Sequence, residues 1–141
     1  MARSRPAGYS GTPLPRKLGI KEGATVVLVS APGAFESTLG ELPEGVRLRH
    51  GNRGAREITI WFVSSERELG RRFDAIAGAV GEGTLWVAWP KQTSRLAGDM
   101  TEDSVRDVAL PKGLVDTKVC AIDDDWSGLR LTKRRTRPGS P

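Results

Sequence analysis

Residues 58–89 read ITIWFVSSERELGRRFDAIAGAVGEGTLWVAW, and this stretch decides the fold. It opens with a β-branched and aromatic run, 58–63, and closes with a second apolar run, 85–89, so each end predicts a buried strand. The residues between them place apolar side chains at helical spacing: Leu69, Phe73, Ile76 and Val80. That stripe predicts a helix with one buried face.

The ends of this helix are also marked in the sequence. Ser65 followed by Glu68 three residues later is a capping box, in which each side chain can accept from a free backbone N–H. Gly81-Glu82-Gly83 stops the helix. A strand, a helix and a second strand in this order predict two parallel strands covered by a helix.

The flanking sequence extends the pattern in both directions. Before the deciding stretch, residues 24–29 predict a central strand, 35–42 a short helix and 46–49 an edge strand. After it, residues 101–109 predict a helix that Thr101 caps, and 115–122 predict a further strand. A turn and a half-exposed strand then follow at residues 123–133.

The predicted order is therefore β-α-β-β-α-β-α-β-β. It indicates the α/β class: a single three-layer domain with a mostly parallel central sheet of about 5–6 strands and a C-terminal antiparallel hairpin strand. We predict a disordered basic tail at 1–7, an extended arm docked on the domain at 8–23, the α/β domain at 24–133 and a disordered basic tail at 134–141.

The net charge of +5 comes from 22 basic and 17 acidic residues, unevenly placed. Residues 1–23 and 130–141 hold ten of the basic residues and one acid, which leaves 12 basic and 16 acidic residues between them. The surplus of positive charge therefore lies in the ends. It favours a nucleic-acid partner less than a basic domain would.

Several function classes lack the residues they need. Cys120 is the only cysteine and His50 the only histidine, so a zinc site is excluded and a nucleophile–histidine pair is poorly supported. The position of Cys120 within a strand run favours a buried structural thiol. The loop at residues 30–33, SAPG, is not the glycine-rich dinucleotide fingerprint. We therefore expect no catalytic set, no metal and no cofactor.

The carboxyl ends of parallel strands are where such sheets bind ligands. Three segments should meet there: residues 30–33, residues 89–91 and the acidic turn at 122–128. The candidate ligand-binding residues are Trp89, Lys91, Asp123, Asp125, Trp126, Ser127, Gly33 and Tyr9. An anion could use the N–H groups after Pro32, with Lys91 as its counter-charge; a plain turn and a solvated lysine are the alternative.

The acidic turn and the tryptophans each have a second interpretation. Asp123 and Asp125 fit the start of a calcium loop, but Arg134 stands where the bidentate glutamate is needed, so a hairpin turn is favoured over a weak metal site. Trp89 and Trp126 could line a pocket or pack beneath the N-terminal segment. Trp61 and Trp86 are expected in the core.

Several long motifs carry a family resemblance. They include GYSGTPL at 8–14, LWVAWPK at 85–91, KVCAID at 118–123 and WSGLR at 126–130. Over roughly residues 8–132 the chain resembles a family of uncharacterised bacterial proteins, domain-of-unknown-function family 3052. The resemblance implies a small single-domain bacterial protein and brings no reaction, ligand or catalytic residue. Members often have a second lysine after W-P-K, where this chain has Gln92.

The sequence favours a non-enzymatic binding or regulatory module, whose partner is an unknown small molecule or protein. One alternative is nucleic-acid binding through the basic ends. Another is an enzyme for a small anionic substrate with Lys91 and Asp123 as acid and base. No apolar run is long enough to span a membrane, and the N-terminus lacks a signal-peptide core, so we expect a cytoplasmic protein.

Overall fold

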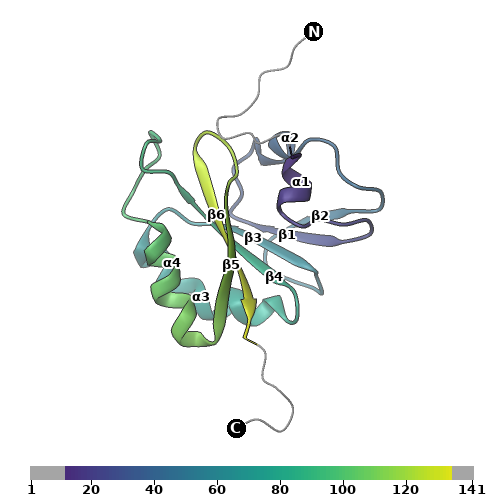
Figure 1. Ribbon diagram of the computed structural model, residues 1–141. Coiled ribbons are helices and arrows are strands. Elements are labelled where there is room, and N and C mark those ends of the chain that lie inside the picture. Colours follow the sequence, from purple (N-terminus) through teal and green to yellow (C-terminus); the bar gives the residue numbers. More distant parts are fainter. Residues whose placement is uncertain (1–11, 135–141) are drawn as a thin grey trace, which may run out of the picture.

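The computed structural model describes residues 12–134. In chain order the elements are α1 (Leu14–Lys17), β1 (Thr25–Val29), α2 (Phe35–Leu39), β2 (Arg47–His50), β3 (Ile58–Phe62), α3 (Glu66–Val80), β4 (Thr84–Pro90), α4 (Glu102–Ala109), the 3-10 helix η1 (Leu110–Lys112), β5 (Leu114–Ala121) and β6 (Trp126–Lys133) (Figure 1). The predicted order of strands and longer helices is confirmed.

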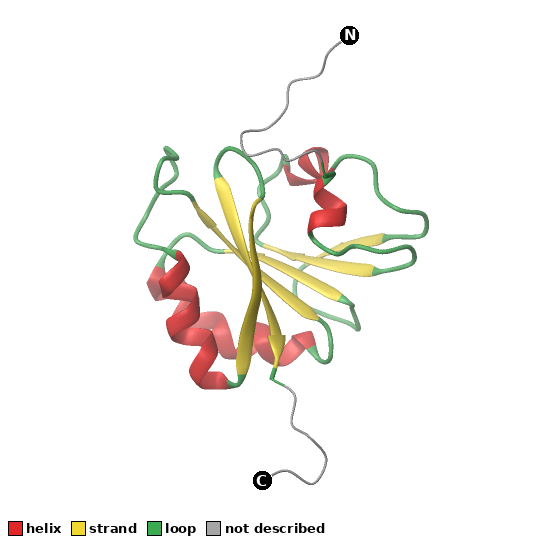
Figure 2. Cartoon of the chain, viewed as in Figure 1, coloured by secondary structure: helices red, strands yellow, loops and turns green. Residues whose placement is uncertain are grey.

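The six strands form one sheet in the order β2-β1-β3-β4-β6-β5. The first four are parallel to one another, whereas β6 runs antiparallel to both β4 and β5 (Figure 2). The chain is thus a single α/β domain with a mixed, mostly parallel sheet and a C-terminal antiparallel hairpin, as predicted.

Each face of the sheet carries its own core. On one face Trp61 packs with Phe73 of α3 and Val105 of α4. On the other face Trp86 packs with Leu18 and with Leu39 of α2. Trp61 and Trp86 are fully buried, so the prediction that both belong to the core is confirmed. The sheet lies between two helical layers, which makes the domain three-layered.

Helix α3 follows the sequence pattern closely. Its buried residues are the predicted stripe, Leu69, Phe73, Ile76 and Val80. The Ser65 hydroxyl accepts from the backbone N–H of Glu68 at 3.1 Å. The cap and the stripe together fix where α3 starts and which side faces the sheet.

The segment before β1 differs from the predicted extended arm. Residues 14–17 form one helical turn, α1, because Pro15 holds a helical φ and its missing N–H costs nothing at a helix start. Leu18 and Ile20 are buried, and the indole Nε1–H of Trp86 donates to the Leu18 carbonyl at 3.0 Å. Within the described part of the chain, this segment is integral to the core of the α1/α2 face.

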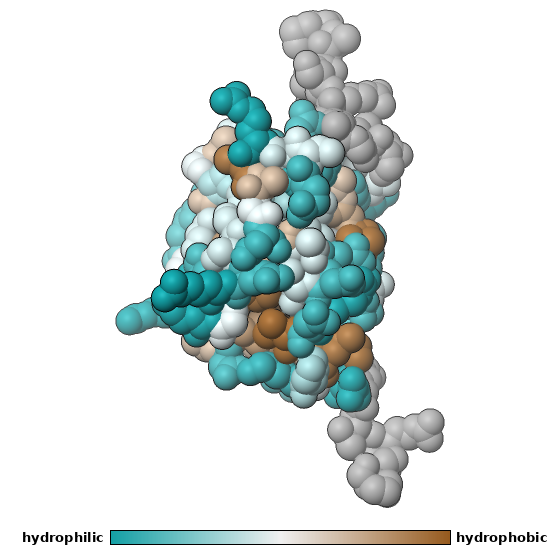
Figure 3. All heavy atoms as spheres, turned by 90° about the vertical axis from the view of Figure 1, so that its left-hand side faces the viewer, coloured by the Kyte–Doolittle hydropathy of each residue, from teal (hydrophilic) through white to brown (hydrophobic). Residues whose placement is uncertain are grey.

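Hydrophilic side chains cover most of the surface on the α4 side of the molecule (Figure 3). Among residues 12–134 the exposed large hydrophobic side chains are Leu96 and Val119. No helix in that range is long and apolar enough to cross a membrane.

Candidate functional site

The turn between β5 and β6 is held in place by its own aspartates. The Asp123 carboxylate accepts from the backbone N–H groups of Asp125 and Trp126, at 2.8 and 2.9 Å. The Asp125 carboxylate accepts from the Ser94 hydroxyl at 2.8 Å, and its carbonyl accepts from the Lys91 N–H at 2.8 Å. The structure therefore brings Lys91, Asp123 and Asp125 together at the carboxyl end of β4.

The two tryptophans of the candidate set lie on opposite faces of the sheet. Trp89 is buried in the core beneath α3 and α4. Trp126 is buried on the α1/α2 face, where its ring meets Phe62 edge-on with centroids 5.0 Å apart. Ser127 pairs with Trp89 across the strands. Paired residues point to the same face and successive residues to opposite faces, so Trp126, which pairs with Pro90, faces away from Trp89. The two tryptophans therefore cannot line one pocket.

The remaining candidates are separate from that turn or outside the structure. Gly33 is exposed in the loop that joins β1 to α2. Tyr9 lies outside the described residues, so its role stays a prediction.

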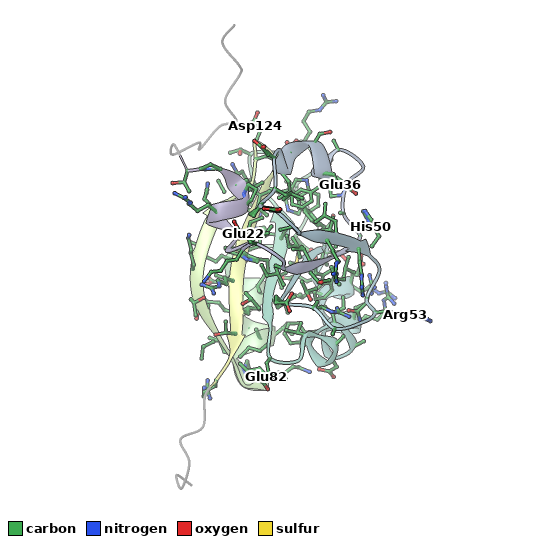
Figure 4. The ribbon with its side chains drawn as sticks, turned by 90° about the vertical axis from the view of Figure 1, so that its right-hand side faces the viewer. Glu22, Glu36, His50, Arg53, Glu82 and Asp124 are labelled. Atoms are coloured by element: carbon green, nitrogen blue, oxygen red, sulfur yellow. The ribbon has the colours of Figure 1, made fainter. Side chains whose placement is uncertain are left out.

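A hollow of about 1270 Å³ opens between α1, α2 and the β5–β6 turn. Its walls come from three segments far apart in sequence: residues 12–22 without Leu18, residues 37–43 and residues 121–125. Figure 4 views the molecule from the side of these elements, with Asp124 at the top and Glu22 beside α1. Of the candidates named from the sequence, Asp123 and Asp125 line the hollow, whereas Trp89, Lys91, Trp126, Ser127 and Gly33 do not.

Acidic side chains outnumber basic ones around the hollow. The lining includes five acids, Glu22, Glu41, Asp123, Asp124 and Asp125, and three bases, Arg16, Lys17 and Lys21. The Lys17 ammonium is tied to the structure, since it donates to the Ala121 carbonyl at 3.1 Å. Sequence reasoning missed the α1 and 37–43 walls, because no local pattern tells which helix lies beside the hairpin turn.

Cys120 lies next to the hollow and is half-buried. Burial raises the pKa of its thiol, and the nearby ammonium groups of Lys17 and Lys118 offset only part of that rise. The thiol therefore stays protonated at neutral pH, which suits a structural cysteine better than a nucleophile.

After β1 the chain adds β2 on one side of it and then returns to add β3 on the other side, so the order of strands reverses between β1 and β3. Helix α2, which follows β1, covers one face, and α3, which follows β3, covers the other. At this point Ser30 adopts a φ of 58°, unusual for a residue other than glycine, and its hydroxyl accepts from Arg72 at 3.3 Å. Sheets of this kind bind ligands at such a reversal point.

The α3 N-terminus at this point already has acceptors from within the chain. Asp99 accepts from the backbone N–H of Glu66 at 2.8 Å, and Ser65 caps the N–H of Glu68. A carboxylate of the protein thus already accepts at a helix N-terminus that could otherwise bind an external anion. Across residues 12–134, no group of three or more His, Cys, Asp or Glu side chains could hold a metal ion.

The fold and the site geometry together define a Rossmann-like α/β protein with an open, mixed-charge hollow beside its C-terminal hairpin. Residues 52–135 match the family model described as "Protein of unknown function (DUF3052)". The chain belongs to this family, as the resemblance implied; the match begins later than the motif at residues 8–14. No curated protein matches the sequence.

Solved structures confirm the fold. A protein of the NADB-Rossmann superfamily from Streptococcus agalactiae superposes with a TM-score of 0.58 at 9% identity, over 94% of this chain and 72% of its own. A SAM-dependent methyltransferase from Aquifex aeolicus gives 0.57 at 15% identity, over 84% and 86%. The N-methyltransferase NodS from Bradyrhizobium japonicum gives 0.54 at 12% identity, over 86% and 93%. At such identities the likeness concerns the fold alone.

Proposed function

We propose that this protein is a non-enzymatic binding module whose ligand occupies the hollow between α1, α2 and the β5–β6 turn. The observation that carries the proposal is the convergence of three distant segments on one concave space of about 1270 Å³. Concave spaces with a few convergent polar groups are the usual sites for small molecules.

The lining favours a small ligand with a cationic group and an apolar body. Leu14, Leu42 and Ile122 supply apolar surface, and acids outnumber bases on the walls. A positively charged group near Glu22 and Glu41 would gain Coulomb energy from both carboxylates. S-adenosylmethionine carries a cationic sulfonium and a flat aromatic adenine that can pack against apolar side chains, and it is one compound to test; one structural neighbour is named as dependent on it.

The alternative of an acid–base enzyme at Lys91 and Asp123 gains less support. The Asp123 carboxylate is already engaged by two backbone N–H groups, and Lys91 does not line the hollow. Nucleic-acid binding through the basic ends stays a further alternative. The structure does not bear on it, because Arg3, Arg5 and Arg135 lie outside the described residues. The expectation of a cytoplasmic location belongs with this proposal and rests on the sequence alone.

The proposal is tested by thermal-shift measurements on the full chain with cationic, neutral and anionic metabolites, including S-adenosylmethionine and nucleotides. A ligand at 100 times its Kd should stabilise the protein by about 2.7 kcal/mol. Cationic compounds are expected to give the largest rise in Tm.

Two tryptophan variants locate the site. Ser37→Trp places a large ring on an exposed residue of the wall, and Thr93→Trp places one on an exposed loop outside it. The first should abolish the ligand-induced rise in Tm and the second should leave it intact. If no compound raises Tm, or if both variants respond like the unmodified chain, the hollow is not the binding site. Should a ligand be turned over, Lys91→Ala and Asp123→Asn would separate chemistry from binding.

A further inference from the structure

The basic residues inside the domain are concentrated in one part of the chain. Between residues 47 and 72 there are seven arginines, no lysine and three glutamates, whereas the region 24–129 as a whole has 12 basic and 16 acidic residues. The region 24–129, which has a net negative charge, therefore contains one strongly positive segment.

The fold gathers most of these arginines on one surface. Leu48 packs on the α1/α2 face, so its strand neighbours Arg47 and Arg49 point to the α3 side of the sheet edge. The Arg49 guanidinium lies against Gly54, at 2.8 Å from the position that a Cβ would take there. The loop that carries Arg53 thus adjoins the side chain of Arg49.

Helix α3 adds two further arginines. The Asn52 side chain donates to the Ala75 carbonyl at 3.4 Å, which places the loop beside the helix. Arg71 lies one helical turn before Ala75 on the same side, and Arg72 reaches Ser30 directly after β1, the strand next to β2. We call this surface the arginine patch; it comprises Arg47, Arg49, Arg53, Arg71 and Arg72. Arg53 and His50 mark its outer rim (Figure 4).

Two carboxylates near the patch have partners other than its arginines. Glu36 contacts His50 at the rim at 2.7 Å, and Asp74 pairs with Lys112 at 2.6 Å. Among the ion pairs within residues 12–134, only Arg72 of the patch takes part, with Glu68 at 3.4 Å. Beneath the patch Arg56 is buried, and its guanidinium donates only to neutral oxygens, which adds positive potential.

We propose that the arginine patch binds the phosphate backbone of a nucleic-acid duplex. Arginine presents a planar fork that pairs with phosphate oxygens in a bidentate way. The exposed large hydrophobic residues of the described chain, Leu96 and Val119, lie outside the patch, so it lacks the apolar centre of a protein interface. All tryptophans and phenylalanines within residues 12–134 are buried, so none of them offers single-stranded bases an exposed ring to stack on.

The test measures binding of the full chain to a labelled 20-base-pair duplex, DNA or RNA, by fluorescence anisotropy at 50, 100 and 200 mM salt. Four phosphate contacts on DNA predict that log K falls against log salt with a slope of about −3.6, or roughly 150-fold between 50 and 200 mM. The triple variant Arg49→Gln, Arg53→Gln, Arg71→Gln should weaken binding at 50 mM at least tenfold and flatten the slope to about −1.

The matched control is Arg95→Gln, Lys118→Gln, Lys133→Gln, which removes the same charge from exposed positions elsewhere in the domain. It should bind within threefold of the unmodified chain. A second control, Arg3→Gln, Arg5→Gln, Arg135→Gln, Arg137→Gln, tests the basic ends, and binding should persist there. Thermal melts check that each variant is folded.

Several results would overturn the assignment. They are no duplex binding at 50 mM salt, an equal loss in the domain control, or a loss confined to the variant of the ends. Displacement of the duplex by poly-glutamate at equal charge concentration would assign the patch to an acidic protein instead. The hollow is separate from the patch, so ligand binding there should survive the triple variant, and the two proposals can fail independently.

Discussion

Two glycines, Gly83 and Gly70, differ in how much space surrounds them. A Cβ at Gly83 would lie 2.5 Å from the Glu57 carbonyl oxygen, so the backbone itself excludes any larger residue there. Gly70 is exposed on α3, and nothing lies within 4 Å of the position of its Cβ. Glycine is therefore required by close packing at residue 83, whereas residue 70 has room for a larger side chain.

We expect Gly83→Ala to lower the free energy of unfolding by about 1–3 kcal/mol, because one chain segment must move away from the other. Gly70→Ala should raise it by about 0.5–1 kcal/mol, since alanine favours a helix more than glycine does. Urea denaturation of both variants checks this. A stabilised Gly83→Ala would contradict the close approach of residues 57 and 83.

An ion pair predicts how stability depends on pH. Arg106 donates to Asp116 at 2.8 Å, and this bond holds the pKa of the Asp116 carboxyl below its ordinary value of 3.8. A depressed pKa in the folded state means that the stabilisation is present above pH 3.8 and is lost as pH falls through the folded value. Asp116→Asn should therefore be less stable than the unmodified chain at pH 7, by a margin that shrinks below pH 4.

Denaturation at pH 7, 5 and 3 measures that margin. Asp107→Asn is the control, because Asp107 is exposed on α4 next to Arg106 and has no ion-pair partner within residues 12–134. The difference in free energy of unfolding between Asp107→Asn and the unmodified chain should not shrink as pH falls from 7 to 3. A margin for Asp116→Asn that is as large at pH 3 as at pH 7 would mean that the ion pair does not stabilise the fold.

At the scale of the elements, α4 depends on its first turn. The Thr101 hydroxyl accepts from the N–H of Ser104 at 3.1 Å, and the Ser104 hydroxyl accepts from the N–H of Thr101 at 3.0 Å. Thr101→Val keeps the shape but removes the acceptor, so it should lower the free energy of unfolding by about 1 kcal/mol. Thr93→Val, in an exposed loop, should change it by less than about 0.5 kcal/mol. Equal effects in urea denaturation would argue against the cap.

The elements were predictable from sequence where one local pattern dominates. The apolar stripe of α3 repeats every 3.6 residues, whereas β3 and β4 are continuous apolar runs, and all three are buried as expected. The helical turn α1 was not predicted, because four residues are too few to show a period and Pro13 and Pro15 suggest an extended chain. Proline is also common in the first turn of a helix, and in this segment that preference prevailed over the extended conformation.

The site was less predictable, because it depends on which elements lie side by side. The acidic turn and Lys91 do meet, as the parallel strands suggested. The opposite placement of Trp89 and Trp126 follows from strand register, which the sequence does not specify across an antiparallel pair. The arginine patch joins β2, a loop and α3 and can be recognised only once their packing is known.

At the scale of the whole molecule, stability should fall from the centre of the sheet to its edges. β1 and β3 are buried along their whole length, whereas β2 at one edge is mostly exposed. Hydrogen exchange followed by mass spectrometry should find amides of residues 26–29 and 58–62 the slowest, and those of 47–50 faster by local opening. Equal protection of β2 and β3 would indicate one cooperative sheet without a weak edge.

Because of the antiparallel hairpin, the two ends of the described chain lie at opposite ends of the sheet. Thr12 lies beside the hollow, and β6 carries the chain away from it to the opposite end of the sheet, where Lys133 pairs with Leu114 (Figure 1). A fluorescent protein or surface anchor joined directly after Arg134 would therefore start at the end remote from the hollow, whereas one joined directly before Thr12 would start beside it. For a biosensor or an immobilised assay, the carboxyl end of the described domain is the place to attach the reporter.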